Sequence, residues 1–273
     1  MSPRPKNAKD VFRPSLKGEV YALFFLALSF FASPTHAADN RVWQLYASGR
    51  YDDAMKAGEA QNNAAGLALA ARAGLAQEMM RAQPCLDCLK HIEADARRAV
   101  ALDPRLPDGH IYLAAALGYE ARIEGLISAR LHAYPDQAKT HLDAALAGDP
   151  ENCWALAALG GWHIEIVRGG GETLAHWVYS ASIDEGLGYF ARAFQCAPDN
   201  LVFRYQYALA LGGYDPKHYR SEIEDALAHA AAMKPSTAYE AFAQVRAREL
   251  LTTLRAKEMK QFAKLVRRDQ GYP

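Results

Sequence analysis

A recurring helix ending constrains this chain more than any other feature of its sequence. Four segments each place an alanine five residues before a proline: Ala99–Pro104, Ala145–Pro150, Ala193–Pro198 and Ala230–Pro235. The small alanine lets a helix pack closely on a neighbour. The proline lacks an N–H group and clashes with the preceding turn, so it cannot continue that helix. Each segment therefore predicts the end of one helix and the start of another.

Glycines flanked by large apolar residues follow each of the first three stops, after a short polar turn. They lie in the segments Leu117–Tyr119, Leu159–Trp162 and Leu211–Tyr214. Glycine at these positions is expected to let two helices approach closely. A helix with such a glycine, a second helix, an alanine and a proline stop together resemble the tetratricopeptide repeat. An earlier segment, Leu45–Ala54, resembles the turn inside such a repeat and is expected to open the array.

The repeats are longer than the standard tetratricopeptide unit. The stop prolines lie 46, 48 and 37 residues apart, against about 34 in that repeat. The extra residues fall at 120–135 and 167–182, which we interpret as extended first helices with long connectors. The chain has alanine-rich runs and few segments in which Val, Ile and Thr alternate with other residues, and both features favour helix over strand. The predicted fold is all-α: a tetratricopeptide-like superhelix of antiparallel pairs over residues 38–273, about four to five pairs, closed by a capping helix at about 237–268.

Residues 1–37 have the three parts of a secretory signal peptide. Basic residues up to Lys17 precede an apolar run over 20–31, and Thr35 and Ala37 are small enough for signal peptidase. The run is shorter than the roughly 20 residues of a spanning helix. We expect cleavage before Ala38 and a periplasmic protein without a stable membrane span. An inner-membrane protein anchored by an uncleaved leader is the alternative.

The charge balance and the motif content argue against several classes of function. Basic and acidic residues both number 31, so no net field attracts nucleic acid. The sequence contains no phosphate-binding loop, dinucleotide fingerprint or nucleophile turn. Trp162, His163, Glu165 and Arg168 resemble an acid–base group, but on a helix these four residues do not all point one way. We expect no catalytic residue, no cofactor and no bound metal ion.

Two phrases carry a second family resemblance. The first is Leu159–Ile166, with Gly160, Trp162 and Glu165, and the second is Gly188–Pro198. Together they resemble the regulator of microtubule dynamics family over roughly residues 85–255. This family is tetratricopeptide-like, and the resemblance implies an adaptor or tether, with lipid binding proposed for some members. The lengthened repeats also look like the helical accessory component of tripartite TRAP transporters. Neither resemblance implies an active site.

The four cysteines are expected to be structural. Cys153 begins the first helix of its repeat and Cys196 ends the second. Because paired helices run antiparallel, these ends should meet and form a disulfide. Cys85 and Cys88 have redox-motif spacing but lie in a loop between helices, so a local disulfide or a pair of structural thiols is expected.

A partner or ligand should meet the inner surface of the superhelix, which the first helix of each pair lines. The predicted lining consists of Trp154, Ala157, Gly161, Ile164, Glu165, Tyr112, Tyr119 and Tyr205. Small residues beside aromatic ones leave room for an extended peptide or an acyl chain.

Three functions follow from these observations. The first is a non-enzymatic periplasmic scaffold that binds another protein or peptide. The second is an accessory protein for a hydrophobic or lipid-like small molecule, including one that serves a transporter. The third is an enzyme built on helical repeats, which would need a cluster of polar side chains in the groove that the sequence does not indicate. We expect the first.

Overall fold

The computed structural model describes residues 34–81 and 83–273, which form thirteen helices and no strand. The all-α prediction is confirmed. Most of the predicted leader lies outside the described residues, so the cleavage point and the localisation remain predictions. Among the described helices, none combines the length and the apolarity needed to cross a membrane. The helices are α1 (Pro34–Ala47), α2 (Tyr51–Gln61), α3 (Ala64–Met80), α4 (Leu86–Leu102), α5 (Pro107–Glu124), α6 (Leu126–Leu131), α7 (Tyr134–Gly148), α8 (Cys153–Tyr179), α9 (Ile183–Cys196), α10 (Leu201–Tyr214), α11 (Arg220–Ala232), α12 (Ala238–Arg255) and α13 (Met259–Asp269).

The alanine–proline segments end helices as predicted. They terminate α4, α7, α9 and α11, and each helix stops two or three residues before its proline. The four alanines are fully buried, which agrees with close packing at these positions. Two of the next helices, α8 and α10, begin at asparagine caps: Asn152 accepts from Ala155 N, and Asn200 accepts from Phe203 N. Such caps satisfy N–H groups that the first turn of a helix leaves free.

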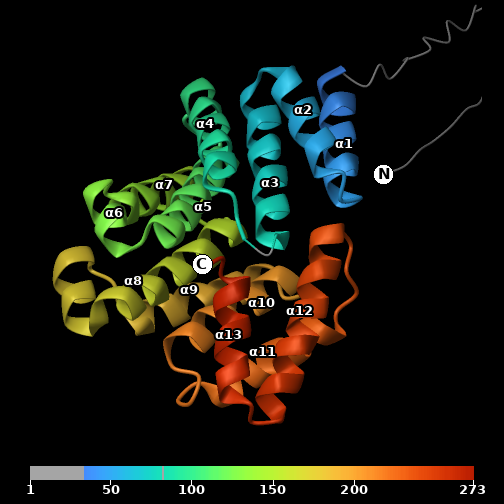
Figure 1. Ribbon diagram of the computed structural model, residues 1–273. Coiled ribbons are helices and arrows are strands. Elements are labelled where there is room, and N and C mark those ends of the chain that lie inside the picture. The colour runs from blue at the N-terminus through green and yellow to red at the C-terminus, as the bar shows by residue number, and fades with distance from the viewer. Residues whose placement is uncertain (1–33, 82) are drawn as a thin grey trace, which may run out of the picture. The chain divides into compact units, whose positions relative to one another are not determined.

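The helices pack as successive antiparallel pairs (Figure 1). The described residues contain six pairs rather than four to five: α1/α2, α3/α4, α5/α7, α8/α9, α10/α11 and α12/α13. The prediction of a single capping helix at about 237–268 was wrong, because two helices, α12 and α13, cover these residues. The chain turns between α12 and α13, with Lys257 in the left-handed region at φ 61°. Neither glycine nor proline marks this turn, so the sequence reads as one continuous helix there.

The two extra segments are mostly helical. The first contains the short helix α6 rather than only a connector, and the second extends α8 to Tyr179. Gly171 interrupts α8 with φ 75° and ψ 161°, a conformation that favours glycine because a side chain would be strained. The prediction of extended first helices therefore holds for α8, while α5 ends at Glu124.

The array curves until its last pair meets its first. Helix α12 contacts both α1 and α3. The Tyr239 hydroxyl of α12 donates to Met79 Sδ of α3 at 3.4 Å, and its side chain is buried with Val42 and Tyr46 of α1. The first helices of all six described pairs consequently surround a common interior.

Both cysteine pairs lie within disulfide-bonding distance. Cys153 and Cys196 join the start of α8 to the end of α9, with Cα atoms 5.7 Å apart. Cys85 and Cys88 pair at the start of α4, with Cα atoms 5.1 Å apart. The Cys153–Cys196 prediction is confirmed, and the local disulfide is the outcome for Cys85 and Cys88.

A buried carboxyl group on α5 makes stability depend on pH. Glu120 is fully buried and accepts from the Tyr134 hydroxyl at 3.3 Å, while its Oε1 atom has no hydrogen-bond partner among the described residues. Burial, and next the nearby carboxylate of Glu93, raise the pKa of Glu120 from 4.5 to about 7. Between about pH 4.5 and 7, the folded protein therefore keeps a proton on Glu120 that the unfolded chain has already released.

We expect Glu120→Gln to stabilise the protein at pH 8 by about 1–3 kcal/mol and to leave it nearly unchanged at pH 4.5. Stability of the natural chain falls as pH rises through this window, because the unfolded chain ionises this group while the folded protein holds it protonated, whereas glutamine does not titrate. Thermal unfolding at both pH values measures the difference. The exposed Glu222→Gln on α11 is the control. An equal effect of Glu120→Gln at both pH values would contradict the assignment.

Candidate binding cavity

The inner surface of the helix array encloses a cavity of about 840 Å³. The first helices α1, α3, α5, α8, α10 and α12 all contribute side chains to its wall, together with α6, α7, α9, α13 and the residues after α13. Most lining residues are aliphatic or aromatic. This volume lies within the range of about 300–1,000 Å³ that small-molecule sites occupy. The curvature that brings α12 to α1 therefore creates a site large enough for a ligand.

Six of the eight predicted lining residues lie on the cavity wall: Trp154, Ala157, Gly161, Glu165, Tyr112 and Tyr119. Ile164 and Tyr205 do not, and this part of the prediction was wrong. Both are almost completely buried in the core. Ile164 lies on the side of α8 that packs against α9, next to Gly186. Its neighbours Gly161 and Glu165 line the cavity instead.

The motif glycines have two different roles. A Cβ atom at Gly160 would lie 2.6 Å from the Phe190 ring and 2.9 Å from the Gly186 carbonyl oxygen, so this glycine lets α8 and α9 approach as predicted. Gly118 does not, because a Cβ atom there would meet nothing within 4 Å. Gly118 and Gly161 line the cavity and enlarge it by lacking side chains.

Trp162 and Glu165 lie on the same wall as Gly161. The Trp162 indole donates to the Pro135 carbonyl at 3.0 Å, which fixes the ring at the cavity surface. Glu165 accepts from Arg168 through both oxygens, at 2.6 and 3.1 Å. Trp162 thus lines the cavity as well as packing against its neighbours. The Glu165 carboxylate is not free, because it is in an ion pair with Arg168.

A polar group closes one side of the cavity around Tyr272. Its hydroxyl hydrogen-bonds to both Glu165 and Arg168. The guanidinium groups of Arg168 and Arg267 lie 4.6 and 5.1 Å from the ring centroid, at distances typical of cation–π contacts. Arg122 lies 3.6 Å from Glu165, and its Nε atom is buried without a hydrogen-bond partner among the described residues.

A second arginine is held among aromatic rings at the other side. The Arg72 guanidinium lies 4.7 Å from the Tyr46 ring, 4.9 Å from Trp43 and 5.2 Å from Trp154. Nearby, burial raises the pKa of the Tyr112 hydroxyl, which therefore stays neutral at physiological pH. The aromatic rings hold this cation at the cavity wall without neutralising it.

The cavity carries an excess of positive charge that sequence analysis missed. Among the described residues its wall contains five arginines and a single acidic side chain, Glu165: the arginines are Arg72, Arg122, Arg130, Arg168 and Arg267. The whole-chain balance is neutral and hides this excess. A lone arginine in the apolar, alanine-rich α3 is the signal that was available for Arg72.

Exposed apolar side chains lie beside the cavity, on α6 and on α8 beyond Gly171. We call this set the apolar rim. Its large members are exposed by between 42% and 82%: Leu126, Ile127, Leu131, Leu174, Trp177 and Val178. Leu126 and Leu174 also line the cavity, so the rim is continuous with its interior. A hydrogen bond between Arg130 and Tyr179 joins the two helices.

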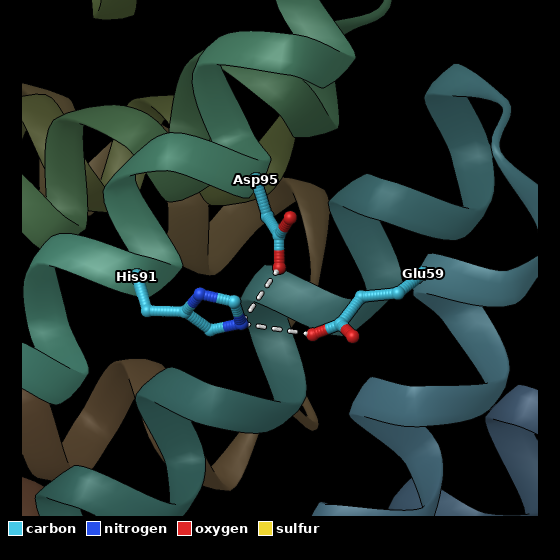
Figure 2. A group of neighbouring side chains, drawn as sticks. All are labelled: Glu59, His91 and Asp95. Atoms are coloured by element: carbon cyan, nitrogen blue, oxygen red, sulfur yellow. Dashed lines mark hydrogen bonds and ion pairs between the residues drawn. The ribbon is translucent and has the colours of Figure 1, made fainter.

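One further group of side chains has the composition of a metal site. Glu59 of α2 with His91 and Asp95 of α4 face one another (Figure 2). None of the three lines the cavity.

Comparison with known proteins identifies one family. The family model described as Regulator of microtubule dynamics protein 1-3 matches residues 93–255. No match was found among curated proteins. The matched span agrees with the resemblance read over residues 85–255, and it contains α5, α8 and α10, which supply much of the cavity wall.

Proposed function

Because the chain belongs to the regulator of microtubule dynamics family, we propose that it is an exported binding protein without catalytic activity and that its cavity holds an amphiphilic anion. Family membership indicates a helical domain of the protein-interaction type. The cavity adds the chemistry of a small ligand. A molecule with a long apolar part and an acidic head fits both the aliphatic wall and the excess of arginine.

One observation carries this proposal: the cavity wall is mostly apolar and contains more arginines than acidic side chains. Aliphatic and aromatic walls favour a hydrocarbon chain, which gains about 25 cal/mol for each Å² removed from water. A carboxylate or phosphate head can accept charge-assisted hydrogen bonds from a guanidinium group. Arg122 is a candidate donor, since its Nε atom makes no hydrogen bond among the described residues and only an ion pair with Glu165 at 3.6 Å, whereas Arg168 donates two hydrogen bonds to Glu165.

Export supports the same function. The predicted leader directs the chain to the periplasm, where disulfides form and persist. Two cysteine pairs at bonding distance suit that compartment. Lipid-like anions need a protein that shields their apolar part while they are outside a bilayer. A periplasmic location also separates this chain from a cytoskeletal role.

Native mass spectrometry of the untagged protein, released gently from the envelope, tests the proposal. We expect a mass beginning at Ala38 with a bound species the size of a lipid. The single substitution Gly161→Trp should abolish or strongly reduce this species, because an indole would project into the cavity from a position with open space around it. The double variant Gly118→Trp/Gly161→Trp should reduce it further.

Gly188→Trp is the matched control. Gly188 is also a helical glycine with nothing within 4 Å of a Cβ atom, but it lies on the exposed side of α9 and does not line the cavity. This variant should retain the bound species. A bare protein in every sample, or a lipid that survives Gly161→Trp, would contradict occupancy of the cavity.

The apolar rim favours a second candidate function, binding of another protein. Exposed apolar patches of contiguous large residues mark interaction surfaces, and Trp177 is 81% exposed. In this case the protein acts as a periplasmic scaffold, and the same spectra would show a bound polypeptide that persists in Gly161→Trp. A complex of that kind without any lipid-sized species would favour the scaffold over the carrier.

A further inference from the structure

Three potential metal ligands converge between helices α2 and α4. His91 and Asp95 are four residues apart on α4, so both lie on the same face of that helix. Glu59 reaches the same point from α2. Figure 2 shows one imidazole nitrogen of His91 facing an oxygen of each of the two carboxylates.

The ligand atoms are spaced as a small cation requires. His91 Nε2 lies 3.0 Å from Glu59 Oε1 and 3.7 Å from Asp95 Oδ2, and all three atoms lie within 4.8 Å of one another. Two ligands of a tetrahedral zinc ion, each about 2.0–2.1 Å from the metal, are about 3.3 Å apart. Small rotations of the exposed side chains therefore bring the set to coordination distances.

Asp95 supplies independent evidence for a ligand. The residue is only 3% exposed, yet its Oδ2 atom, which faces His91, has no hydrogen-bond partner among the described residues. A buried carboxylate oxygen without a partner is destabilising. Arg98 is the cation closest to Asp95, and it lies 3.5 Å from the other oxygen, Oδ1. Oδ2 is thus directed at the point between His91 and Glu59 and is unsatisfied there.

We propose that Glu59, His91 and Asp95 bind a divalent transition-metal ion. One imidazole and two carboxylates form a mixed nitrogen–oxygen set that suits zinc and related ions. When both carboxylates are ionised, they and Arg98 together carry a net charge of −1, which attracts a cation. Glu59 and His91 are partly exposed, which leaves a path for the ion and room for water in its remaining positions.

The ion would join helices of successive pairs. Helix α2 is the second helix of the first pair and α4 is the second helix of the next, and both pack against α3. A metal bridge between them fixes the spacing of the first two pairs. Binding should therefore raise the thermal stability of the protein, because a ligand that binds only the folded state stabilises it.

Titration of the chelator-treated, full-length protein with zinc chloride tests the site. We expect one strongly bound ion, observed by calorimetry, and an increase in the melting temperature. Loss of an outer partner of a metal ligand already costs about 10–100-fold in affinity. His91→Ala and Asp95→Asn, which remove direct ligands, should therefore weaken binding by about 100-fold or more. His229→Ala on α11 should leave binding unchanged.

Cobalt provides a second readout that does not depend on stability. Its visible absorption should appear with the natural protein and be lost in His91→Ala. Glu59→Gln removes the partly exposed carboxylate and keeps the test decisive if Asp95→Asn does not fold. Zinc binding that is absent, or equally strong in Glu59→Gln, His91→Ala and the natural protein, would overturn the proposal and leave His91 as the ion-pair partner of two carboxylates.

Discussion

A chain in which Cys153 and Cys196 are both replaced by serine is expected to lose about 4 kcal/mol of its free energy of unfolding. The disulfide closes a loop with a sequence separation of 43 residues, which removes much conformational freedom from the unfolded chain. Cys196 is exposed and Cys153 only half-buried, so the substitutions themselves change little in the core. Thermal unfolding should show a fall in melting temperature of roughly 8–16 °C.

Replacement of Cys85 and Cys88 by serine provides the control. Their separation is only 3 residues, so the same chain-entropy relation gives about 2 kcal/mol, half the effect of the longer loop. Unfolding in the presence and absence of a reductant offers a second comparison. If both double variants lose the same stability, or if reduction leaves the melting temperature unchanged, the entropic account of the Cys153–Cys196 bridge is wrong.

Alanine at Gly160 is expected to destabilise the protein by about 1–3 kcal/mol, although alanine normally improves a helix. A Cβ atom there would lie 2.6 Å from the Phe190 ring and 2.9 Å from a backbone oxygen of α9. Phe190 is almost completely buried and cannot move away without disturbing the core. Helices α8 and α9 would therefore have to separate. Chemical denaturation measures the loss.

The adjacent residue should respond in the opposite direction. Gly161 has open space around it, so Gly161→Ala should stabilise the protein by about 0.4–1 kcal/mol because it restricts the unfolded chain. Gly188→Ala should behave in the same way. Destabilisation of similar size at Gly160 and Gly161 would show that the contact between α8 and α9 is not what distinguishes them.

Local signals predicted the helices and several of their contacts. The alanine–proline segments locate the ends of four helices, because the stop and the small packing residue lie within six consecutive positions. The Cys153–Cys196 pair followed from antiparallel packing alone. Fold class and that contact need no knowledge of distant parts of the chain, and for that reason both could be predicted.

Features that depend on distant contacts or on weak local signals were missed. The turn at Lys257 has no glycine or proline to mark it, so one long capping helix was predicted where two helices form. Ile164 was placed in the groove because the register of α8 against α9 was unknown. The cavity arginines come from helices far apart in sequence, and only the closure of the array collects them. Glu59 and His91, 32 positions apart, meet because α2 and α4 both pack against α3, which the sequence does not show locally.

Contact of α12 with α1 and α3 fixes how many repeats this protein can contain. In an open solenoid each repeat contacts only its neighbours, so a unit can be added or deleted without loss of the rest. Here the first and last pairs of the array contact each other. An extra pair of helices would separate Tyr239 from Met79 and open the wall of the cavity. Duplication or deletion of a repeat would therefore break the contact between the two ends of the array. An insertion such as α6 adds to the cavity wall and leaves the number of pairs intact.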